Sequence, residues 1–211
     1  MSARKPPSHL ALSTRERVLA AAESLLAERT AEFSMRDLAA AAGVSFATPF
    51  NQFGDKLSIM RALSAARIDQ MHERAAAAEL SADATERVLE VVAIAVGVMI
   101  ENPAVNRAVM GAIGAPGTTA GDIRERSRAL WAAALGDGTG LMKEHLALAR
   151  SVLPEQLANA FRGVLSFWTA GEVRDQDLRA EALAAAATLL LGFSASTRRD
   201  RLIVLMAASS R

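Results

Sequence analysis

The sequence contains no cysteine and no tyrosine, only six prolines in 211 residues, and almost no net charge. Without cysteine, the chain cannot form disulfide bonds, thiolate nucleophiles or cysteine-ligated metal sites, which is consistent with a reducing, cytoplasmic location. Aromatic residues make up only 4%, whereas 51% of the residues are hydrophobic, mostly alanine and leucine. This composition supports helices well and strands poorly, so we expect an all-α fold with a sizeable core.

The formal net charge is only +1, and residues 1–60 carry seven Lys or Arg against six Asp or Glu. Binding to nucleic acid would therefore depend on where the charges lie. Long apolar runs are also missing: Glu90 interrupts the longest, residues 88–100, which is shorter than the roughly 20 residues that span a bilayer. We expect a buried core helix there, no secretory signal in residues 1–13 and no membrane partner.

Motifs for catalysis or metal binding are missing as well. The three histidines, His9, His72 and His145, lie far apart and do not have metal-ligand spacing. There is no serine nucleophile elbow, and the glycines of residues 111–121 lack the preceding strand and the Gly-Lys-Ser/Thr ending of a phosphate loop. We expect no catalytic residue, metal or cofactor. An all-helical enzyme whose site is assembled across several helices stays an alternative.

Residues 34–56 have the pattern of two helices joined by a tight turn, SMRDLAAAAGVSFATPFNQFGDK. Ser34 can cap the first helix, whose small apolar residues keep helical spacing. Gly43 ends that helix, because glycine enters the left-handed backbone conformation without steric cost. Ser45 is the expected N-cap of a short second helix. This layout is a helix-turn-helix, whose second helix fits the major groove of DNA.

The same residues resemble the signature of the TetR-type transcriptional regulators. A small-residue helix is followed by Gly43-Val44-Ser45, and Thr48, Phe50, Phe53 and Lys56 then fall at the family's places, over roughly residues 14–65. The resemblance implies an all-helical homodimer with a ligand-binding body, and a Lys56 that contacts a DNA phosphate. The expected DNA-binding residues are Ser34, Arg36, Ser45, Phe46, Ala47, Thr48, Phe50, Asn51, Gln52 and Lys56.

Two positions depart from the family pattern. With Ser45 as N-cap, Pro49 is the fourth helical residue and removes little hydrogen bonding. It disfavours helical angles at Thr48, so a distorted first turn is expected. Phe50 stands where the family usually has tyrosine, so one hydroxyl contact to a phosphate is expected to be missing.

We divide the chain into a flexible basic arm (1–12), a helix-turn-helix domain (13–54) and a helical regulatory and dimerisation domain (55–211). The arm could reach a minor groove or be a solvated tail. Ser13 and Glu16 form a capping box that opens the first helix. Arg15 and Arg17 in its first turn contact phosphate or are solvated, two readings that stay open. A helix capped by Asp55 should run to about residue 80 and connect the two domains.

Helical spacing in the larger domain predicts helices over residues 88–100, 103–113, 122–135, 141–153, 154–171, 178–193 and 197–208. Pro154 should begin the fifth of these. The charged face of residues 122–135 is expected to be solvated. Dimerisation is expected through residues 154–171 and 178–193, where Ala182, Ala185 and Ala186 permit close approach. The alternative is that these alanines belong to the core of one chain.

An effector pocket is expected between the helices of residues 88–100, 106–113, 122–135 and 157–168. Thioethers and aromatic rings adapt to apolar ligands, although core packing also explains each of them. Few ionisable groups are expected on those faces, so the effector should be small and apolar, neutral or weakly polar. The candidate ligand-binding residues are Met99, Met110, Trp131, Phe167 and Trp168.

The sequence therefore predicts a ligand-responsive transcriptional regulator, a repressor that binds a palindromic double-stranded DNA operator as a dimer. Thr48, Asn51 and Gln52 could bond base edges, and Phe46 and Ala47 could touch thymine methyl groups. The second helix has no Lys or Arg, so a helical protein-interaction module that does not bind DNA is the main alternative.

Overall fold

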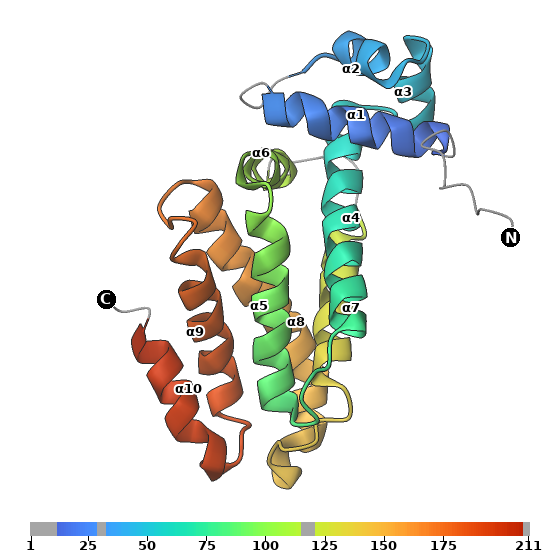
Figure 1. Ribbon diagram of the computed structural model, residues 1–211. Coiled ribbons are helices and arrows are strands. Elements are labelled where there is room, and N and C mark those ends of the chain that lie inside the picture. Colours follow the sequence, from blue (N-terminus) through green and yellow to red (C-terminus); the bar gives the residue numbers. More distant parts are fainter. Residues whose placement is uncertain (1–11, 29–32, 115–120, 209–211) are drawn as a thin grey trace, which may run out of the picture.

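The computed structural model describes residues 12–28, 33–114 and 121–208, and these residues are helical apart from short connections. A small head lies across one end of a longer helical body, and α4 runs from the head down one side of the body (Figure 1). The all-α prediction is confirmed. The expected arm lies almost wholly in residues 1–11, outside the described residues. The head and its connection to the body comprise α1 (Thr14–Glu28), α2 (Met35–Ala42), α3 (Ala47–Phe53) and α4 (Lys56–Ala77).

Local capping signals start these helices where the sequence indicates. Ser13 Oγ accepts a hydrogen bond from the Glu16 backbone N–H at 3.2 Å, and the Glu16 carboxylate accepts one from the Ser13 N–H at 2.7 Å. Asp55 Oδ1 accepts a hydrogen bond from the Ser58 N–H at 2.7 Å and so caps α4. Such caps satisfy amides that have no partner inside the helix. Both capping predictions are confirmed.

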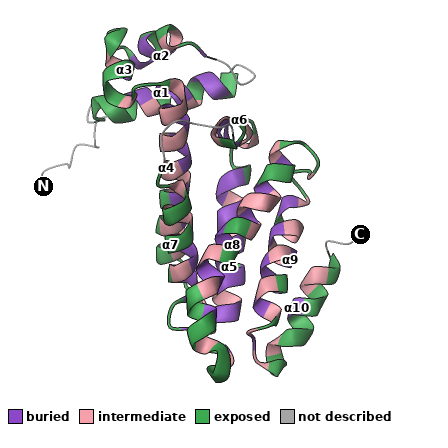
Figure 2. Cartoon of the chain, turned by 180° about the vertical axis from the view of Figure 1, so that it is seen from behind, coloured by how far each residue is buried: buried purple, intermediate pink, exposed green. Residues whose placement is uncertain are grey.

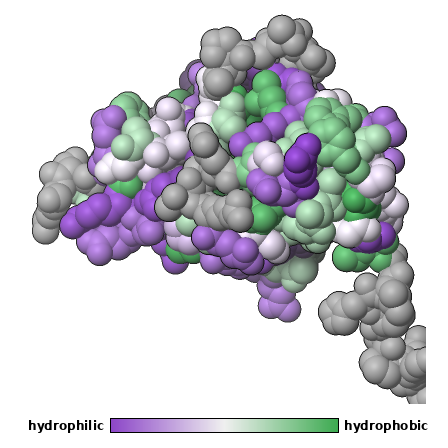
Figure 3. Space-filling model, turned by 90° about the horizontal axis from the view of Figure 1, so that it is seen from above, coloured by the Kyte–Doolittle hydropathy of each residue, from purple (hydrophilic) through white to green (hydrophobic). Residues whose placement is uncertain are grey.

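The core of the head continues into α4 and α6. Buried residues of α1 and α2 pack against Ile59, Met60 and Leu63 of α4 and against Val105 and Val109 of α6. The head is therefore held against the body by apolar contacts as well as by the chain. Its outer face, seen from above in Figure 3, carries hydrophobic and hydrophilic residues side by side.

The body is built around α5, which is apolar on nearly all sides, as predicted for a core helix. Figure 2 shows that most of this helix is buried. Such a helix needs neighbours on several faces, and α4, α6, α7 and α9 all pack against it. The body helices are α5 (Ala84–Ile100), α6 (Pro103–Gly114), α7 (Ile123–Leu135), α8 (Leu146–Thr169), α9 (Leu178–Leu191) and α10 (Ser196–Ala208).

The prediction of two helices over residues 141–153 and 154–171 is wrong. A short 3-10 turn, Lys143–His145, leads into α8, a single helix that contains Pro154 in its interior. A proline inside a helix costs about 3 kcal/mol, because it removes a hydrogen bond and crowds the preceding turn. Here Pro154 is buried on the same apolar face as Leu153 and Leu157, and burying that face along one continuous helix offsets the cost.

The alanine faces expected at a dimer interface lie inside the chain. Ala182 and Ala186 are 2% and 3% exposed and belong to the body core, and α10 packs along α9. For these two residues the intramolecular alternative is correct. The large apolar side chains exposed on the neighbouring helices are instead Leu148 and Phe167 of α8 and Ile203 and Val204 of α10.

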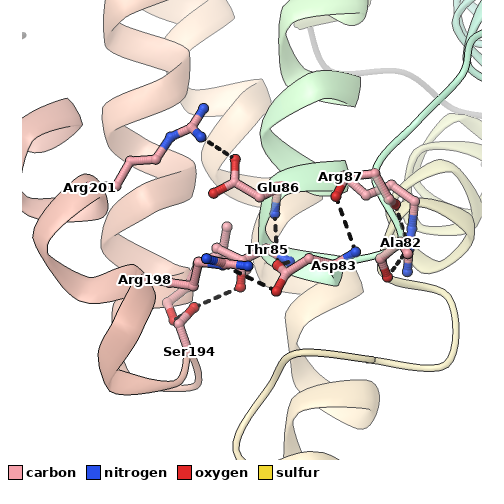
Figure 4. A network of polar contacts seen from close by, with 10 residues as sticks. Ala82, Asp83, Thr85, Glu86, Arg87, Ser194, Arg198 and Arg201 are labelled. Carbon is pink, nitrogen blue, oxygen red and sulfur yellow. Dashed lines mark hydrogen bonds and ion pairs between the residues drawn. The ribbon is translucent and has the colours of Figure 1, made fainter.

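Ion pairs hold α10 to the start of α5 at the end of the body remote from the head (Figure 4). Asp83, which caps α5, pairs with Arg198 at 3.2 Å, and Glu86 pairs with Arg201 at 2.7 Å. The basic start of α10 is thus fixed to the body. Within the described ranges, no single helix is long and apolar enough to cross a membrane; α5 and α6 pass that test only together, as a pair bent by 100°.

Candidate DNA-binding surface and effector cavity

The turn between α2 and α3 has the geometry that its residues predict. Ser34 Oγ accepts a hydrogen bond from the Asp37 backbone N–H at 3.1 Å, and the Asp37 carboxylate accepts one from the Ser34 N–H at 3.0 Å. Gly43 ends α2 with φ of 62°, in the left-handed region that residues with a Cβ rarely adopt. Its N–H and that of Val44 bond back to α2, which sets the direction in which the chain enters α3.

Two arginines of α1 brace this turn and α3. The Nη2 group of Arg17 donates to the carbonyls of Ala42 and Gly43, at 2.7 and 2.9 Å. The Nη2 charge of Arg17 is therefore directed at the negative end of α2, a role that neither of the two alternatives from the sequence includes. Arg15 lies 4.7 Å from the centre of the Phe53 ring, so its guanidinium rests on the end of α3.

The second helix starts later than predicted. The helix α3 begins at Ala47 with Phe46 as N-cap, and the Ser45 hydroxyl bonds the Thr48 hydroxyl at 2.8 Å instead of capping a backbone amide. Pro49 is thus the third helical residue, where its missing N–H has no helical acceptor in any case. Thr48 is helical, and its N–H bonds Ser45 O at 3.0 Å. The expected distortion of the first helical turn is therefore limited to one hydrogen bond between residues three positions apart, from Thr48 to Ser45.

The expected DNA-binding residues all reach the surface of the head. Thr48 and Lys56 are half-exposed, and the others are exposed. Phe46 and Phe50, 54% and 41% exposed, meet edge to face with ring centres 5.4 Å apart. An exposed aromatic pair this close on a short helix provides no core packing, so it favours contact with another molecule.

Positive charge flanks α3 without lying on it. Lys56 Nζ is 4.7 Å from the centre of the Phe33 ring, at the start of α4. The Arg36 guanidinium is 5.9 Å from the centre of the Phe46 ring. Both aromatic rings hold a cation beside the exposed side chains of α3. The head therefore offers polar and apolar groups for base edges in the middle and cations for phosphates at the rim.

A cavity of about 410 Å³ lies in the body between α4, α6, α7 and α8, with Met99 of α5 also in its wall. Met99 and Met110, two of the candidate ligand-binding residues, line it. The expectation that Trp131, Phe167 and Trp168 also line it is wrong. The cavity is within the range of about 300–1,000 Å³ that small-molecule sites occupy.

Helix phase explains the error at Phe167, and local packing explains those at the two tryptophans. Phe161 and Leu165 of α8 face the cavity, and Phe167, two residues further on, is rotated by about 200° and is 55% exposed. Trp168 is fully buried and donates from Nε1 to Asp175 at 2.7 Å, so it anchors the turn after α8. Trp131 is also fully buried, but it packs edge to face on the far side of Phe161, with ring centres 5.4 Å apart.

The cavity wall is more polar than predicted. Four arginines line it, and no Asp or Glu among the described residues does. Two of the four lie on α4, a helix that the prediction did not include, and the other two lie on helices predicted to carry few ionisable groups. One signal was available in the sequence: Arg162 falls within the helical stripe of Phe161 and Leu165, and Asn106 within that of Val109. A polar residue in an apolar stripe indicates a special environment. The four arginines are Arg61, Arg67, Arg124 and Arg162.

Arg67 links the cavity to the head. Its Nε donates to Asn106 Oδ1 at 2.9 Å, and its Nη2 forms an ion pair with Glu23 of α1. Asn106 is 1% exposed and donates to the carbonyls of Val98 and Met99 at 3.2 and 2.8 Å. One guanidinium in the cavity wall therefore joins α4 and α6 of the body to α1 of the head.

Within the residues that the structure describes, no group of three or more His, Asp or Glu is arranged to hold a metal ion. The helix-turn-helix, its exposed second helix and the flanking cations define a DNA-binding transcriptional regulator. Comparison with known proteins then identifies the family of the head. Residues 18–63 match the family model described as bacterial regulatory proteins, tetR family. The head is therefore a TetR-type DNA-binding domain.

Solved structures extend the likeness from the head to the body. A TetR transcriptional regulator from Rhodococcus sp. RHA1 is similar with a TM-score of 0.67 and 23% identity, over 84% of this chain and 96% of that one. A TetR-family regulator from Marinobacter aquaeolei VT8 has a TM-score of 0.56 and 14% identity, over 94% of this chain and 99% of that one. A gamma-butyrolactone receptor has a TM-score of 0.54 and 15% identity, over 93% of this chain and 96% of that one. No curated protein sequence matches the chain.

Proposed function

We propose that the protein is a cytoplasmic, homodimeric repressor that binds a near-palindromic DNA operator and is controlled by a small effector bound in the body cavity. The observation that carries this proposal is the row of the half-exposed Thr48 and the exposed Asn51 and Gln52 on α3, held by a braced turn. Short polar side chains can bond base edges in the major groove. Lys56 and Arg36 at the rim would bind phosphates and supply the electrostatic part of the DNA affinity, because α3 itself has no Lys or Arg.

The short length of the recognition helix α3 favours a dimer. The helix α3 has seven residues, so one copy can read only a few base pairs. Two copies related by a two-fold axis would read two half-sites of a near-palindrome. We assign the dimer contact to α8 and α10, because Phe167, Ile203 and Val204 are three of the four large apolar side chains that these helices expose, Leu148 being the fourth.

Effector control follows from the position of the cavity. Its wall includes Arg61, Ser64 and Arg67 of α4, the helix that connects head and body. A ligand that binds one arrangement of α4 more tightly than another shifts DNA affinity by that difference, and by no more. The gamma-butyrolactone receptor of the same fold is consistent with a small organic effector.

Selection of bound DNA from a random pool tests the proposal. The enriched sequences should form two inverted half-sites whose centres lie about one helical turn, or a multiple of it, apart. Gln52→Ala should then change the base preference at one position in each half-site. Gln70→Ala, an amide lost from α4 away from the head surface, is the matched control. Failure to enrich any sequence, with the protein folded and dimeric, would favour the protein-interaction alternative.

A further inference from the structure

The arginines of the cavity are unequally neutralised. Arg67 pairs with Glu23, and Arg124 pairs with Glu155. No described carboxylate forms an ion pair with Arg61 or Arg162. The hydrogen bond from Ser58 lowers the pKa of Asp55, and the charge of Arg61 adds to that effect. The wall thus carries uncompensated positive charge.

Of the two arginines, Arg162 has the greater need of an anionic partner. It is half-buried on the apolar face of α8, and its Nη1 lies 3.2 Å from Met110 Sδ, a weak acceptor. Burial lowers the pKa of Arg162, and no neighbouring charge counteracts the effect. A cation that is withdrawn from water without a partner destabilises the protein. A bound anion would remove this cost.

The rest of the cavity suits the apolar part of such a ligand. Met99, Met110, Phe161 and Leu165 lie in its wall, and Asn159 adds a polar amide on the same helix as Arg162. Flexible thioethers adapt to chains of different shape. The planar guanidinium group matches a carboxylate with two parallel hydrogen bonds, so a carboxylate is the anion that it binds with the best geometry.

We propose that the cavity binds an amphiphilic carboxylate, with its apolar chain among the methionines and Phe161 and its head group on Arg162 and Arg61. This inference rests on the proposed function in taking the cavity as the effector site. It replaces the neutral, apolar effector expected from the sequence with an anionic one that keeps an apolar body.

Calorimetric titration of the full-length protein with decanoate and with 1-decanol, both below their aggregation concentrations, tests the proposal. The two compounds have the same hydrocarbon length, so a difference in affinity measures the contribution of the charged head group. Decanoate should bind at least about tenfold more tightly than 1-decanol, the effect of one charge-assisted hydrogen bond. Arg162→Gln should weaken decanoate by at least about tenfold and change 1-decanol by less than about threefold, whereas Arg162→Lys should keep part of the affinity. Arg150→Gln, an exposed arginine of the same helix outside the cavity, is the matched control and should change neither.

Equal affinities for decanoate and 1-decanol, or equal losses in Arg162→Gln and Arg150→Gln, would overturn the inference. Circular dichroism checks that each variant is folded, and Arg61→Gln gives a second test if Arg162→Gln is not. Decanoate binding that depends on Arg162 but leaves DNA affinity unchanged would support the ligand class and contradict effector control. A neutral compound that releases DNA while decanoate does not bind would support effector control and contradict the ligand class.

Discussion

At the scale of single residues, charge acts in this protein through where each side chain is directed. Lys56 and Arg17 are both basic residues near the helix-turn-helix, and they have opposite orientations. Lys56 rests on the Phe33 ring at the surface, and Arg17 points inward to the carbonyls of the turn. The net charge of +1 gives no indication of this difference. Substitution of each residue should therefore affect a different property.

Lys56→Ala should weaken binding to every DNA sequence by a similar factor, because a phosphate contact carries no base information. The slope of log K against log salt concentration should become shallower by about one phosphate's worth. Fluorescence anisotropy at several salt concentrations measures both effects. Lys143→Ala removes the same charge at the other end of the body and should leave the slope unchanged. An unchanged slope in Lys56→Ala would exclude the phosphate contact.

Arg17→Gln should destabilise the protein by about 1–2 kcal/mol, since charge-assisted hydrogen bonds to two carbonyls are lost and water replaces part of them. DNA affinity should also fall, because the turn that orients α3 is no longer braced. Urea denaturation gives the free energy of unfolding. Arg15→Gln, which removes a cation from the Phe53 ring but no hydrogen bond to the turn, should cost clearly less. Equal losses in both variants would contradict the bracing role.

At the scale of elements, α4 carries two features that connect the head to the body. Asp55 caps its first turn, and Arg67 in its middle binds Glu23 of α1 and Asn106 of α6. The cap determines where the helix starts. The arginine determines how α4 is tied to the head beside the cavity.

Asp55→Ala should cost about 1 kcal/mol at neutral pH, the usual effect of losing an N-cap. The hydrogen bond from the Ser58 backbone N–H holds the pKa of Asp55 below its ordinary value of 3.8. Because the pKa is lower in the folded state, this stabilisation is present above pH 3.8 and is lost as pH falls through the folded-state pKa. The wild type should therefore have a higher urea midpoint than Asp55→Ala at neutral pH, and this difference should shrink at acidic pH. Asp55→Asn should keep the cap and lose the pH dependence.

Glu23→Gln should reduce the effect of a cavity ligand on DNA affinity, because it breaks the link between Arg67 and α1 while leaving the cavity wall in place. The quantity to measure is the ratio of DNA affinities with and without decanoate, which is the coupling between the two sites. Glu73→Gln, an exposed carboxylate of α4, is the control. A ratio unchanged from wild type would show that coupling takes another route.

At the scale of the whole molecule, the apolar face of α9 is buried in the body core, whereas α10 exposes apolar side chains to solvent. Ala186→Arg should unfold the chain, since it places an unpaired charge in the core at a cost of about 3–5 kcal/mol. Ile203→Glu should leave a folded chain and dissociate the proposed dimer, because Ile203 is 52% exposed on α10. Sedimentation and circular dichroism distinguish the two outcomes. A folded Ala186→Arg monomer, or an Ile203→Glu dimer as stable as wild type, would place the contact on α9 instead.

The division of the chain at residue 55 stays a prediction, and the structure shows why a sharp division is difficult to draw. The head core includes Ile59, Met60 and Leu63 of α4 and Val105 of α6. The same α4 lines the body cavity with Arg61 and residues further along. Head and body therefore share one helix, which is the physical basis for the coupling that we propose between them.

The sequence by itself determined the features that depend on residues three or four positions apart. The capping box of Ser13, the caps at Ser34 and Asp55 and the left-handed Gly43 all follow from local hydrogen bonding and backbone sterics, and the structure confirms them. The helix-turn-helix could be recognised for the same reason. Ser45 failed as an N-cap because its hydroxyl has a second local partner, Thr48, which competes with the backbone amide.

Only the tertiary structure decided which side chains surround the cavity and which helices stay continuous. Helical spacing alone does not say which neighbour each side of α8 meets, so Phe167 and Trp168 were assigned to the cavity and Arg162 was not. Pro154 stays inside α8 because long-range burial outweighs a local cost. Arg67 meets Glu23 across 44 positions of sequence, and a contact of that kind exists only when packing brings two helices together.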